Sequence, residues 1–458
     1  MKTLVPDAFT APAKGELARL GAEDLQKILF KHESQLNTIG ITPNNAEFWY
    51  AIANEYRHLL TSKEALRFAQ KVYMHLIESQ DNLSADLRSI SSRNLSKLYR
   101  RNGEIKTALQ CALKALKIGQ QTPSYGQTLC YVGDFYRLTL HNAADGCRYY
   151  LQALEWCPTN NNQNVRAQAF IGLGNARYTD NQHRNNADWY LEARRILGSH
   201  GDITLQATAL IGLGNARHSD IQHRKQADWY LEALRVLGST GEITLQAQAL
   251  IGLGNARYTD NQHDRNHWYL EALGILGSHG DIDLQAQALI GLGNARYTDN
   301  QHENNADWYL EALGVLGTHG DISLQAQALI GLGNARYTDH RHDRNYWYRE
   351  ALKVLGDRGD VDLQARALIG LGNARYTDNR HKNDIDWYLE ARRVLGIHGD
   401  VTLQAQALIG LGNAHCSQRD NRTGLDYFRQ ALEIAPNSMK NTIRSNIART
   451  EHFLNKAR

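Results

Sequence analysis

The sequence has little cysteine and proline, and it contains no long run of apolar residues. Its five cysteines are odd in number and scattered, at Cys111, Cys130, Cys147, Cys157 and Cys416. This pattern is not a disulfide framework, and it favours a reducing compartment. No apolar stretch approaches the ~18 residues of a membrane-spanning helix, and the first 20 residues lack the continuous apolar core of a secretory signal. We expect a cytoplasmic protein with no membrane partner, in which residues 1–14, with two of the six prolines, form a mobile tail.

The sequence also lacks a large excess of either charge. It has 51 Lys and Arg side chains against 48 Asp and Glu, a formal net charge of +3 over 458 residues. A nucleic-acid partner needs clustered positive charge, so we do not expect one. The small excess is local, because residues 1–158 hold 19 basic and 15 acidic side chains and the remainder is close to neutral.

The chain contains an internal repeat of 39 or 40 residues. The segment Ile211–Leu250 has near-copies that begin at Ile171, Ile251, Ile290, Ile330, Ile369 and Ile409. A period of this length predicts an array in which each unit buries its apolar face against its neighbours. Within a copy, apolar residues recur at three- and four-residue spacing in two segments, which indicates a helical hairpin.

The copies also carry signals for the ends of their helices. We expect the helix that begins near each Leu-Gln-Ala to be capped by the residue before it, at Thr204, Thr244, Asp283, Ser323, Asp362 and Thr402. We expect glycines in a left-handed conformation to close the preceding helix, at Gly198, Gly238, Gly277, Gly317, Gly356 and Gly396.

The repeat and its flanks divide the chain into four parts. We expect residues 1–43 to form a tail and a capping helix, and 44–158 to form three divergent hairpins. Residues 159–437 hold seven near-identical repeats, and 438–458 are expected to form a closing helix.

Two stretches carry a family resemblance. Leu411-Gly412-Asn413-Ala414 is followed by the run YFRQALEIAPN at 427–437, and Val132-Gly133-Asp134 is followed by the run YYLQAL at 149–154. Both resemble tetratricopeptide repeats, and the long period is similar to that of the Leu-Gly-Asn repeats of adaptor proteins. The resemblance implies an all-α, right-handed superhelical solenoid of about ten hairpins that binds protein partners in its concave groove. The family usually has an aromatic core residue where this chain has arginine, so the hairpin packing is expected to differ there.

An asparagine recurs in every copy on the helix face that lines the groove in the tetratricopeptide family. The asparagine row comprises Asn175, Asn215, Asn255, Asn294, Asn334, Asn373 and Asn413, and Lys97 takes its place in the divergent segment. A tyrosine row, expected on the same side, comprises Tyr178, Tyr258, Tyr297, Tyr337 and Tyr376. These residues are our candidates for binding the backbone of an extended peptide. The alternative is that each asparagine bonds to the neighbouring repeat.

Four other recurrent residue types have a structural or functional interpretation. Gly212 and its equivalents could admit a ligand backbone, whereas Gly214 falls where the family packs its helices. An arginine row, beginning at Arg177, stands three residues before an aspartate row, beginning at Asp180, and predicts internal ion pairs. A histidine row, beginning at His183, is too widely spaced to share one metal ion. The Trp-Tyr pairs, beginning at Trp189, are expected to lie in the core.

No nucleophile, base and orienting acid recur together, so we expect no catalytic site and no cofactor. The sequence favours a non-catalytic adaptor that binds an extended or multivalent protein segment. One alternative is a regulator of the bacterial tetratricopeptide type that senses a small signalling peptide. A helical-repeat nucleic-acid reader is a weaker alternative, because such readers vary their side chains from copy to copy. Specificity could also reside in residues 44–158, and the sequence does not indicate an oligomeric state.

Overall fold

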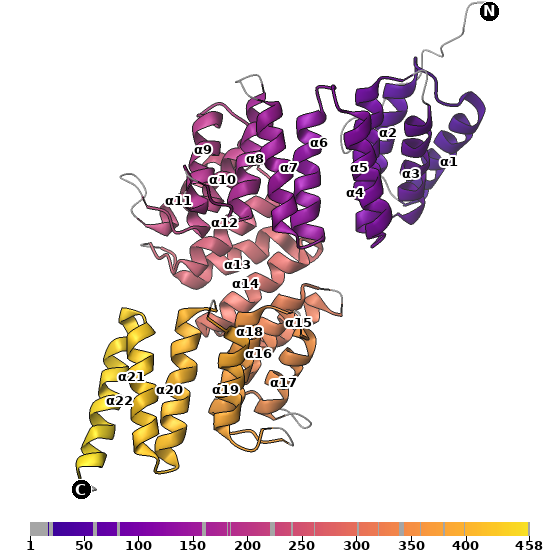
Figure 1. Cartoon of the computed structure of the whole chain (residues 1–458). Helices are drawn as coiled ribbons and strands as arrows, with labels where there is room; N and C mark the ends of the chain where they lie inside the picture. The colour runs from indigo at the N-terminus through magenta and orange to yellow at the C-terminus, as the bar shows by residue number, and fades with distance from the viewer. Residues whose placement is uncertain are drawn as a thin grey trace, which may run out of the picture. The chain divides into compact units, whose positions relative to one another are not determined.

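The computed structural model of the chain contains helices and no strand among the residues that it describes (Figure 1). It is an all-α helical-repeat solenoid, as the sequence predicted. The predicted right-handed sense of the superhelix stays a prediction. The structure describes Leu17 and residues 22–57, 62–79, 83–157, 162–180, 182–183, 185–219, 225–239, 241–260, 262–299, 302–318, 320–338, 343–357, 359–378, 381–397 and 399–456. The expected mobile tail, 1–14, lies outside these residues.

The chain forms two compact units, Met1–Arg224 and Lys225–Arg458. The boundary falls inside a repeat, where the sequence gives no sign of it. None of the described helices is long and apolar enough to cross a membrane.

The described residues of the first unit form ten α-helices, of which the second to the ninth pair as antiparallel hairpins in chain order. They are α1 (Ala22–Ile39), α2 (Ala46–Arg57), α3 (Lys63–Glu78), α4 (Ala85–Arg101), α5 (Ile105–Ile118), α6 (Tyr125–Asp134) with the π-helical turn η2 (Phe135–Thr139), α7 (Ala143–Trp156), α8 (Gln163–Asn175), α9 (Asn186–Leu197) and α10 (Ile203–Asn215).

The second unit continues the same pattern. Its helices are α11 (Gln226–Leu237), α12 (Ile243–Asn255), α13 (Arg265–Leu276), the short η4 (Gly277–His279), α14 (Ile282–Ala295), α15 (Asn305–Leu316), α16 (Ile322–Asn334), α17 (Arg344–Leu355), α18 (Val361–Ala374), α19 (Asp384–Leu395), α20 (Val401–Ser417), α21 (Asn421–Ile434) and α22 (Asn437–Lys456).

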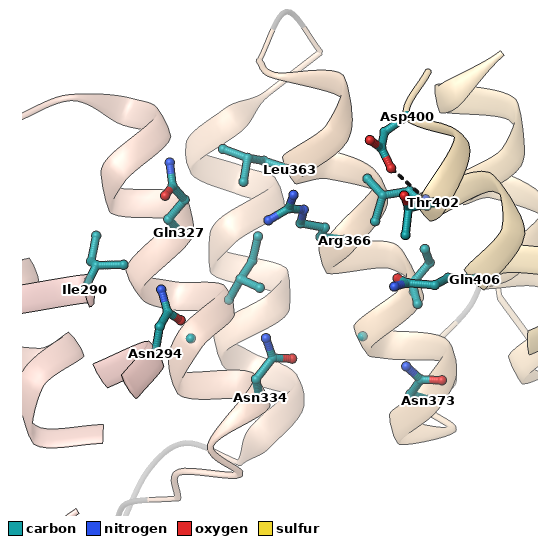
Figure 2. Close-up of a pocket in the computed structure, with 15 residues that line it drawn as sticks. Ile290, Asn294, Gln327, Asn334, Leu363, Arg366, Asn373, Asp400, Thr402 and Gln406 are labelled. Carbon is teal, nitrogen blue, oxygen red and sulfur yellow. Dashed lines mark hydrogen bonds between the residues drawn. The ribbon is translucent and has the colours of Figure 1, made fainter. Parts of the chain in front are cut away.

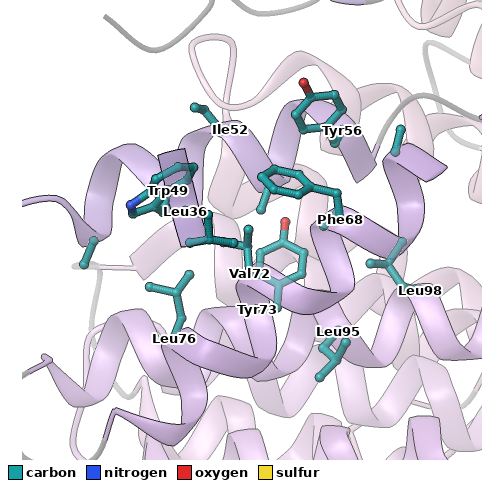
Figure 3. Packing of buried hydrophobic residues seen from close by; sticks show 14 of the residues in the cluster. Leu36, Trp49, Ile52, Tyr56, Phe68, Val72, Tyr73, Leu76, Leu95 and Leu98 are labelled. Carbon is teal, nitrogen blue, oxygen red and sulfur yellow. The ribbon is translucent and has the colours of Figure 1, made fainter. Parts of the chain in front are cut away.

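The N-terminal helices have their own aromatic core, between α1, α2, α3 and α4 (Figure 3). Tyr56 meets Phe68 edge-on at 5.2 Å between ring centroids, and Trp49 meets the same ring at 6.5 Å. Such edge-to-face pairs add to the stabilisation from apolar burial. This core closes the N-terminal end of the repeat array.

In the repeats, a buried tyrosine ring holds consecutive hairpins together. The ring of Tyr309 on α15 lies against Gly293 of its own hairpin and against Gly331 of the next. A Cβ atom at these glycines would come within 2.7 and 2.5 Å of the ring, respectively. The glycines therefore make room for the tyrosine, which offsets the ~1 kcal/mol that each costs in a helix interior. The neighbouring Trp308 is also buried, as predicted.

The helix starts differ from the prediction. The caps are Asp202, Asp321 and their equivalents, which lie two residues before the expected positions, and Asp321 Oδ1 accepts the Leu324 amide hydrogen at 2.9 Å. An exposed isoleucine follows the cap as the first helical residue, for example Ile322. The predicted glycines do close the second helices, with φ near +55°, but ψ at Gly317 is −148°, so they do not adopt the left-handed helical conformation that we expected.

The predicted arginine–aspartate pairs are wrong, because each arginine ends the first helix of its hairpin. Arg296 has φ +58° and ψ +38°, the left-handed conformation, and its amide donates to the Gly293 carbonyl while the Tyr297 amide donates to the Leu292 carbonyl. These two bonds form a Schellman motif, a helix ending in which glycine usually stands at the arginine's place. The same conformation recurs at Arg177, Arg217, Arg257, Arg336 and Arg375. The arginines are exposed and end the helix, so they do not continue a helical face toward the aspartates.

Candidate functional site

The first helices of four consecutive hairpins in the second unit line an open pocket of about 450 Å³ (Figure 2). They are α14, α16, α18 and α20, and we call the first helix of each hairpin its inner helix. We name this pocket the asparagine pocket, because Asn294 of α14, Asn334 of α16 and Asn373 of α18 line it in one row. Buried isoleucines one turn earlier, among them Ile290 and Ile330, form its floor. The first helices of these three hairpins thus present asparagine to the same pocket.

Each asparagine of the pocket is held by the tyrosine of its own hairpin. The Tyr309 hydroxyl donates to Oδ1 of Asn294 at 2.9 Å, and equivalent bonds join Tyr348 to Asn334 and Tyr388 to Asn373 at 2.9 and 2.8 Å. Burial raises the pKa of Tyr309 to about 12, so its hydroxyl stays a donor near neutral pH. The expected alternative, a bond to the neighbouring repeat, is therefore not the arrangement found.

This bond determines which group of the amide faces the pocket. Oδ1 is occupied by the tyrosine, and among the described residues no acceptor bonds to Nδ2 of Asn294, Asn334 or Asn373. All three side chains are exposed. The pocket therefore offers a row of amide donors whose orientation is fixed before any ligand arrives.

The same geometry removes one predicted role of the glycines. A Cβ at Gly370 would lie 2.4 Å from the ring of Tyr348, and one at Gly331 would lie 2.5 Å from that of Tyr309. Although both glycines line the pocket, the space that they leave is filled by tyrosine. They serve the packing between hairpins rather than the close approach of a ligand backbone.

A second polar row, which sequence reasoning missed, runs along the pocket two helical turns before the asparagines. It consists of Gln327, Arg366 and Gln406, on α16, α18 and α20 (Figure 2). In the sequence, each of these three residues stands seven positions before an asparagine. This spacing places the residue and its asparagine on one helical face. Arg366 is the only cation among the residues that line the pocket.

The tyrosine row does not lie beside the asparagines. Tyr297 and its equivalents follow the left-handed arginine, so they leave the helical face on which they were expected. The ring of Tyr297 packs against Trp308 at 5.9 Å, and its carbonyl accepts the Trp308 Nε1 hydrogen at 2.8 Å. Tyr178, Tyr258, Tyr337 and Tyr376 pack in the same way on Trp189, Trp268, Trp347 and Trp387. None of the five lines the asparagine pocket.

The remaining asparagines of the row lie outside this pocket. Asn175 and Asn255 accept the hydroxyl hydrogens of Tyr190 and Tyr269 at 2.7 and 2.8 Å. Asn215 is exposed at the end of α10. Asn413 differs, because Phe428 stands at the tyrosine's place, and it lines a smaller cavity of about 260 Å³ with Arg419 and Arg449. The last hairpin thus breaks the pattern.

Lys97 belongs to a cationic cluster in the first unit. Its ammonium lies 5.5 Å from the ring centroid of Tyr131. One turn earlier on α4, the Arg93 guanidinium donates to Thr128 Oγ1 at 3.2 Å. Burial, followed by the charges of Arg57, Arg93 and Arg100, lowers the pKa of Lys97 to about 8. On the next inner helix, Asp134 replaces the asparagine and accepts the Tyr150 hydroxyl hydrogen at 2.7 Å.

The aspartates predicted to pair with arginine bind histidine instead. In the hairpin connection, Asp299 Oδ1 lies 3.0 Å from His302 Nδ1, and Glu311 Oε2 lies 2.6 Å from His302 Nε2. The imidazole stacks on Trp308 at 3.4 Å between centroids. His183 and His381 repeat the stacking and the aspartate contact. Asp220, Asp339, His223 and His342 of these rows lie outside the described residues.

No family model matches the chain, and no curated protein sequence matches it. The chain is a helical-repeat array, and two of the solved structures similar to it are yeast Tom70 and the TPR domain of P58(IPK). The first is 13% identical, with 90% of this chain and 97% of that chain covered and a TM-score of 0.33. The second is 14% identical, with 90% and 99% covered and a TM-score of 0.24.

Proposed function

We propose that the chain is a non-catalytic interaction protein that binds an extended segment of a partner protein along the asparagine row. The observation that supports this proposal is the row of three oriented Nδ2 donors in the asparagine pocket. A backbone carbonyl of an extended peptide is the natural acceptor for such donors. Because the donors are fixed by the buried tyrosines, little conformational entropy is lost when they bind.

The row repeats on successive helices, and this supports a long ligand over a compact one. A peptide that runs across α14, α16 and α18 can meet one amide on each helix. Binding by several weak, equivalent contacts also suits a partner with repeated segments, because linked contacts raise the overall affinity. A small signalling peptide would occupy only part of this row.

A test of the proposal is to remove the donors while keeping the acceptors. Replacing Asn294, Asn334 and Asn373 by aspartate retains an oxygen for each tyrosine, as Asp134 does for Tyr150. The probe is a peptide selected on the full-length wild-type chain from a displayed library of random sixteen-residue peptides. At ~0.5–1.5 kcal/mol for each hydrogen bond, the triple variant should bind that peptide about ten to a thousand times more weakly.

A matched control adds the same charge outside the pocket. Thr298, Thr338 and Thr377 are exposed, do not line the pocket and follow the asparagines by four residues. Their triple replacement by aspartate should leave the affinity for the selected peptide close to wild type. Equal weakening by both triple variants would indicate a charge effect, and unchanged affinity in the asparagine variant would contradict the proposal.

The cationic cluster around Lys97 supports a second contact on the same partner. Arg93 and Lys97 lie one turn apart on α4, and the lowered pKa of Lys97 reflects its burial and neighbouring positive charges. An acidic group of the partner would relieve this repulsion. If the cluster contributes, Lys97→Met should weaken binding of the full partner and leave the selected sixteen-residue peptide unaffected.

A further inference from the structure

The uniformity of the repeats leaves the position of a bound segment undetermined. The inner helices α12, α14 and α16 present the same asparagine and glutamine at equivalent positions. A peptide shifted by one hairpin would therefore meet nearly the same donors and lose little affinity. Unless some residue differs between the copies, the array cannot hold its ligand in a single register.

Arg366 is such a residue. It lies two helical turns before Asn373, where the other copies carry Gln168, Thr208, Gln248, Gln287, Gln327 or Gln406. The substitution changes a neutral amide into a permanent cation. Each flanking helix keeps glutamine, so a bound chain meets this charge at one point only.

The surroundings of Arg366 leave its guanidinium open to a ligand. The side chain is exposed and lies in the pocket between Gln327 and Gln406 (Figure 2). No described residue forms an ion pair or a hydrogen bond with it. Asp400 lines the same pocket, but its Oδ1 accepts the Leu403 amide hydrogen at 2.9 Å and caps α20.

We propose that Arg366 fixes the register of the bound segment by pairing with an acidic side chain of the partner. This inference rests on the proposed function. A guanidinium binds a carboxylate through two parallel hydrogen bonds, which are stronger and more directional than bonds between neutral groups. One such position in an otherwise uniform contact is enough to select a register, as a single polar residue does in a coiled coil.

The same pocket disfavours a nucleic acid as the occupant. Binding of a phosphate backbone draws on several cations in sequence, whereas the lining of this pocket contains one arginine together with the carboxylate of Asp400. A peptide with one acidic residue among neutral residues matches that distribution of charge. The acidic residue would lie toward the start of α18, on the side of the pocket away from the asparagines.

The test uses the full-length chain and a displayed library of random sixteen-residue peptides. Selections are run on wild type, on Arg366→Gln and on the double variant Gln327→Arg/Arg366→Gln. The single variant carries the residue of the neighbouring copies, and its fold is checked by thermal melting. On wild type, we expect Asp or Glu at one aligned position. Replacing that residue by Asn or Gln should weaken binding to wild type about 10- to 100-fold and should not change binding to Arg366→Gln.

The double variant tests register directly. A selected peptide with a photoreactive benzophenone at one end should crosslink to one hairpin in wild type and to the preceding hairpin in the double variant. An acidic preference that survives in Arg366→Gln, or a crosslink that does not move, would overturn the inference. Selection of peptides without any acidic preference would overturn it and leave the proposed function intact. No selected peptide on any variant would contradict both.

Discussion

Tyr309 donates its hydroxyl hydrogen to Oδ1 of Asn294 at 2.9 Å, from the second helix of a hairpin to the end of the first. This contact links the core to the candidate site, because the ring of Tyr309 is buried while the Nδ2 group of Asn294 faces the pocket. Packing between hairpins and orientation of the donors therefore depend on one side chain. The predictions below separate these two roles.

Tyr309→Phe should remove the bond and keep the packing. We expect a loss of ~0.5–1.5 kcal/mol in the free energy of unfolding, the usual net value of one hydrogen bond, measured by urea denaturation. Phe428→Tyr is the reverse change, made where the chain has phenylalanine beside Asn413, and it should not destabilise. A phenylalanine variant as stable as wild type would show that the hydroxyl bond adds nothing to stability.

Replacing Gly314 and Gly331 by alanine should change the stability of the protein in opposite directions. At Gly314, on the exposed face of α15, a Cβ would meet no atom within 4 Å, so alanine should stabilise by ~1 kcal/mol through its helix propensity. At Gly331, a Cβ would lie 2.5 Å from the Tyr309 ring, so alanine should destabilise by ~1–3 kcal/mol. Thermal and urea unfolding of both variants provides the measurement. Equal effects would show that the ring can move aside.

The contribution of His302 to the free energy of unfolding should fall as the pH rises. Burial lowers the pKa of His302, but hydrogen bonds and charges from Asp299 and Glu311 outweigh burial and raise it above its ordinary value. A raised pKa in the folded state means that the contribution is fully present below about pH 6.5, the unfolded value. It is lost as the pH rises through the folded value.

Urea unfolding of wild type and His302→Gln at several pH values checks this sign. The stability difference in favour of wild type should shrink from pH 6 to pH 9. Glu311→Gln removes one of the two carboxylates. In this background, the contribution of His302 to the free energy of unfolding should depend less on pH. A difference that is constant over this range, or that grows with pH, would contradict a protonated histidine in the hairpin connection.

The left-handed arginines predict an unusual order of stabilities. At Arg296, φ is +58°, which costs an L-residue ~1–2 kcal/mol relative to glycine. Arg296→Gly should therefore be more stable than Arg296→Ala by about 1 kcal/mol. Combining either change with Asp299→Ala should give additive effects, since Asp299 contacts His302 instead. Strong coupling between Arg296 and Asp299 would restore the pairing that the sequence suggested.

Much of the fold could be predicted from the sequence because a repeat shows the same physical constraint several times. The apolar spacing of Trp308, Tyr309, Ala312, Leu313 and Leu316 predicted a buried helical face. Four of these residues are buried, and Leu313 is half-buried. The glycines that close the second helices were also identified, because a positive φ favours glycine.

The errors came from residues that do not follow the usual signals. The first helices end at an arginine in a conformation that glycine usually adopts. Because no glycine marks this end, Tyr297 was expected one turn further along the helix. The helix starts were placed two residues late because an exposed apolar residue, such as Ile322, follows the cap. Arg366 could not be predicted from the features that the copies share, because it is a residue that one copy changes.

The position of each tyrosine ring between two glycines has a consequence for how the array can change length. Tyr309 contacts the second glycine of its own copy and the first glycine of the next, and Gly291 of this copy lies against Tyr269 of the preceding one. This copy therefore supplies a ring to its successor and a space to its predecessor. Tyr150 makes the same contacts with Gly133 and Gly172 where the divergent hairpins meet the regular ones. A duplication or excision of one complete period, at whatever point the cut falls, recreates both contacts without any new residue. Recombination within the gene could therefore lengthen or shorten this binding surface in whole repeats, while a change of half a period would leave one ring without its space.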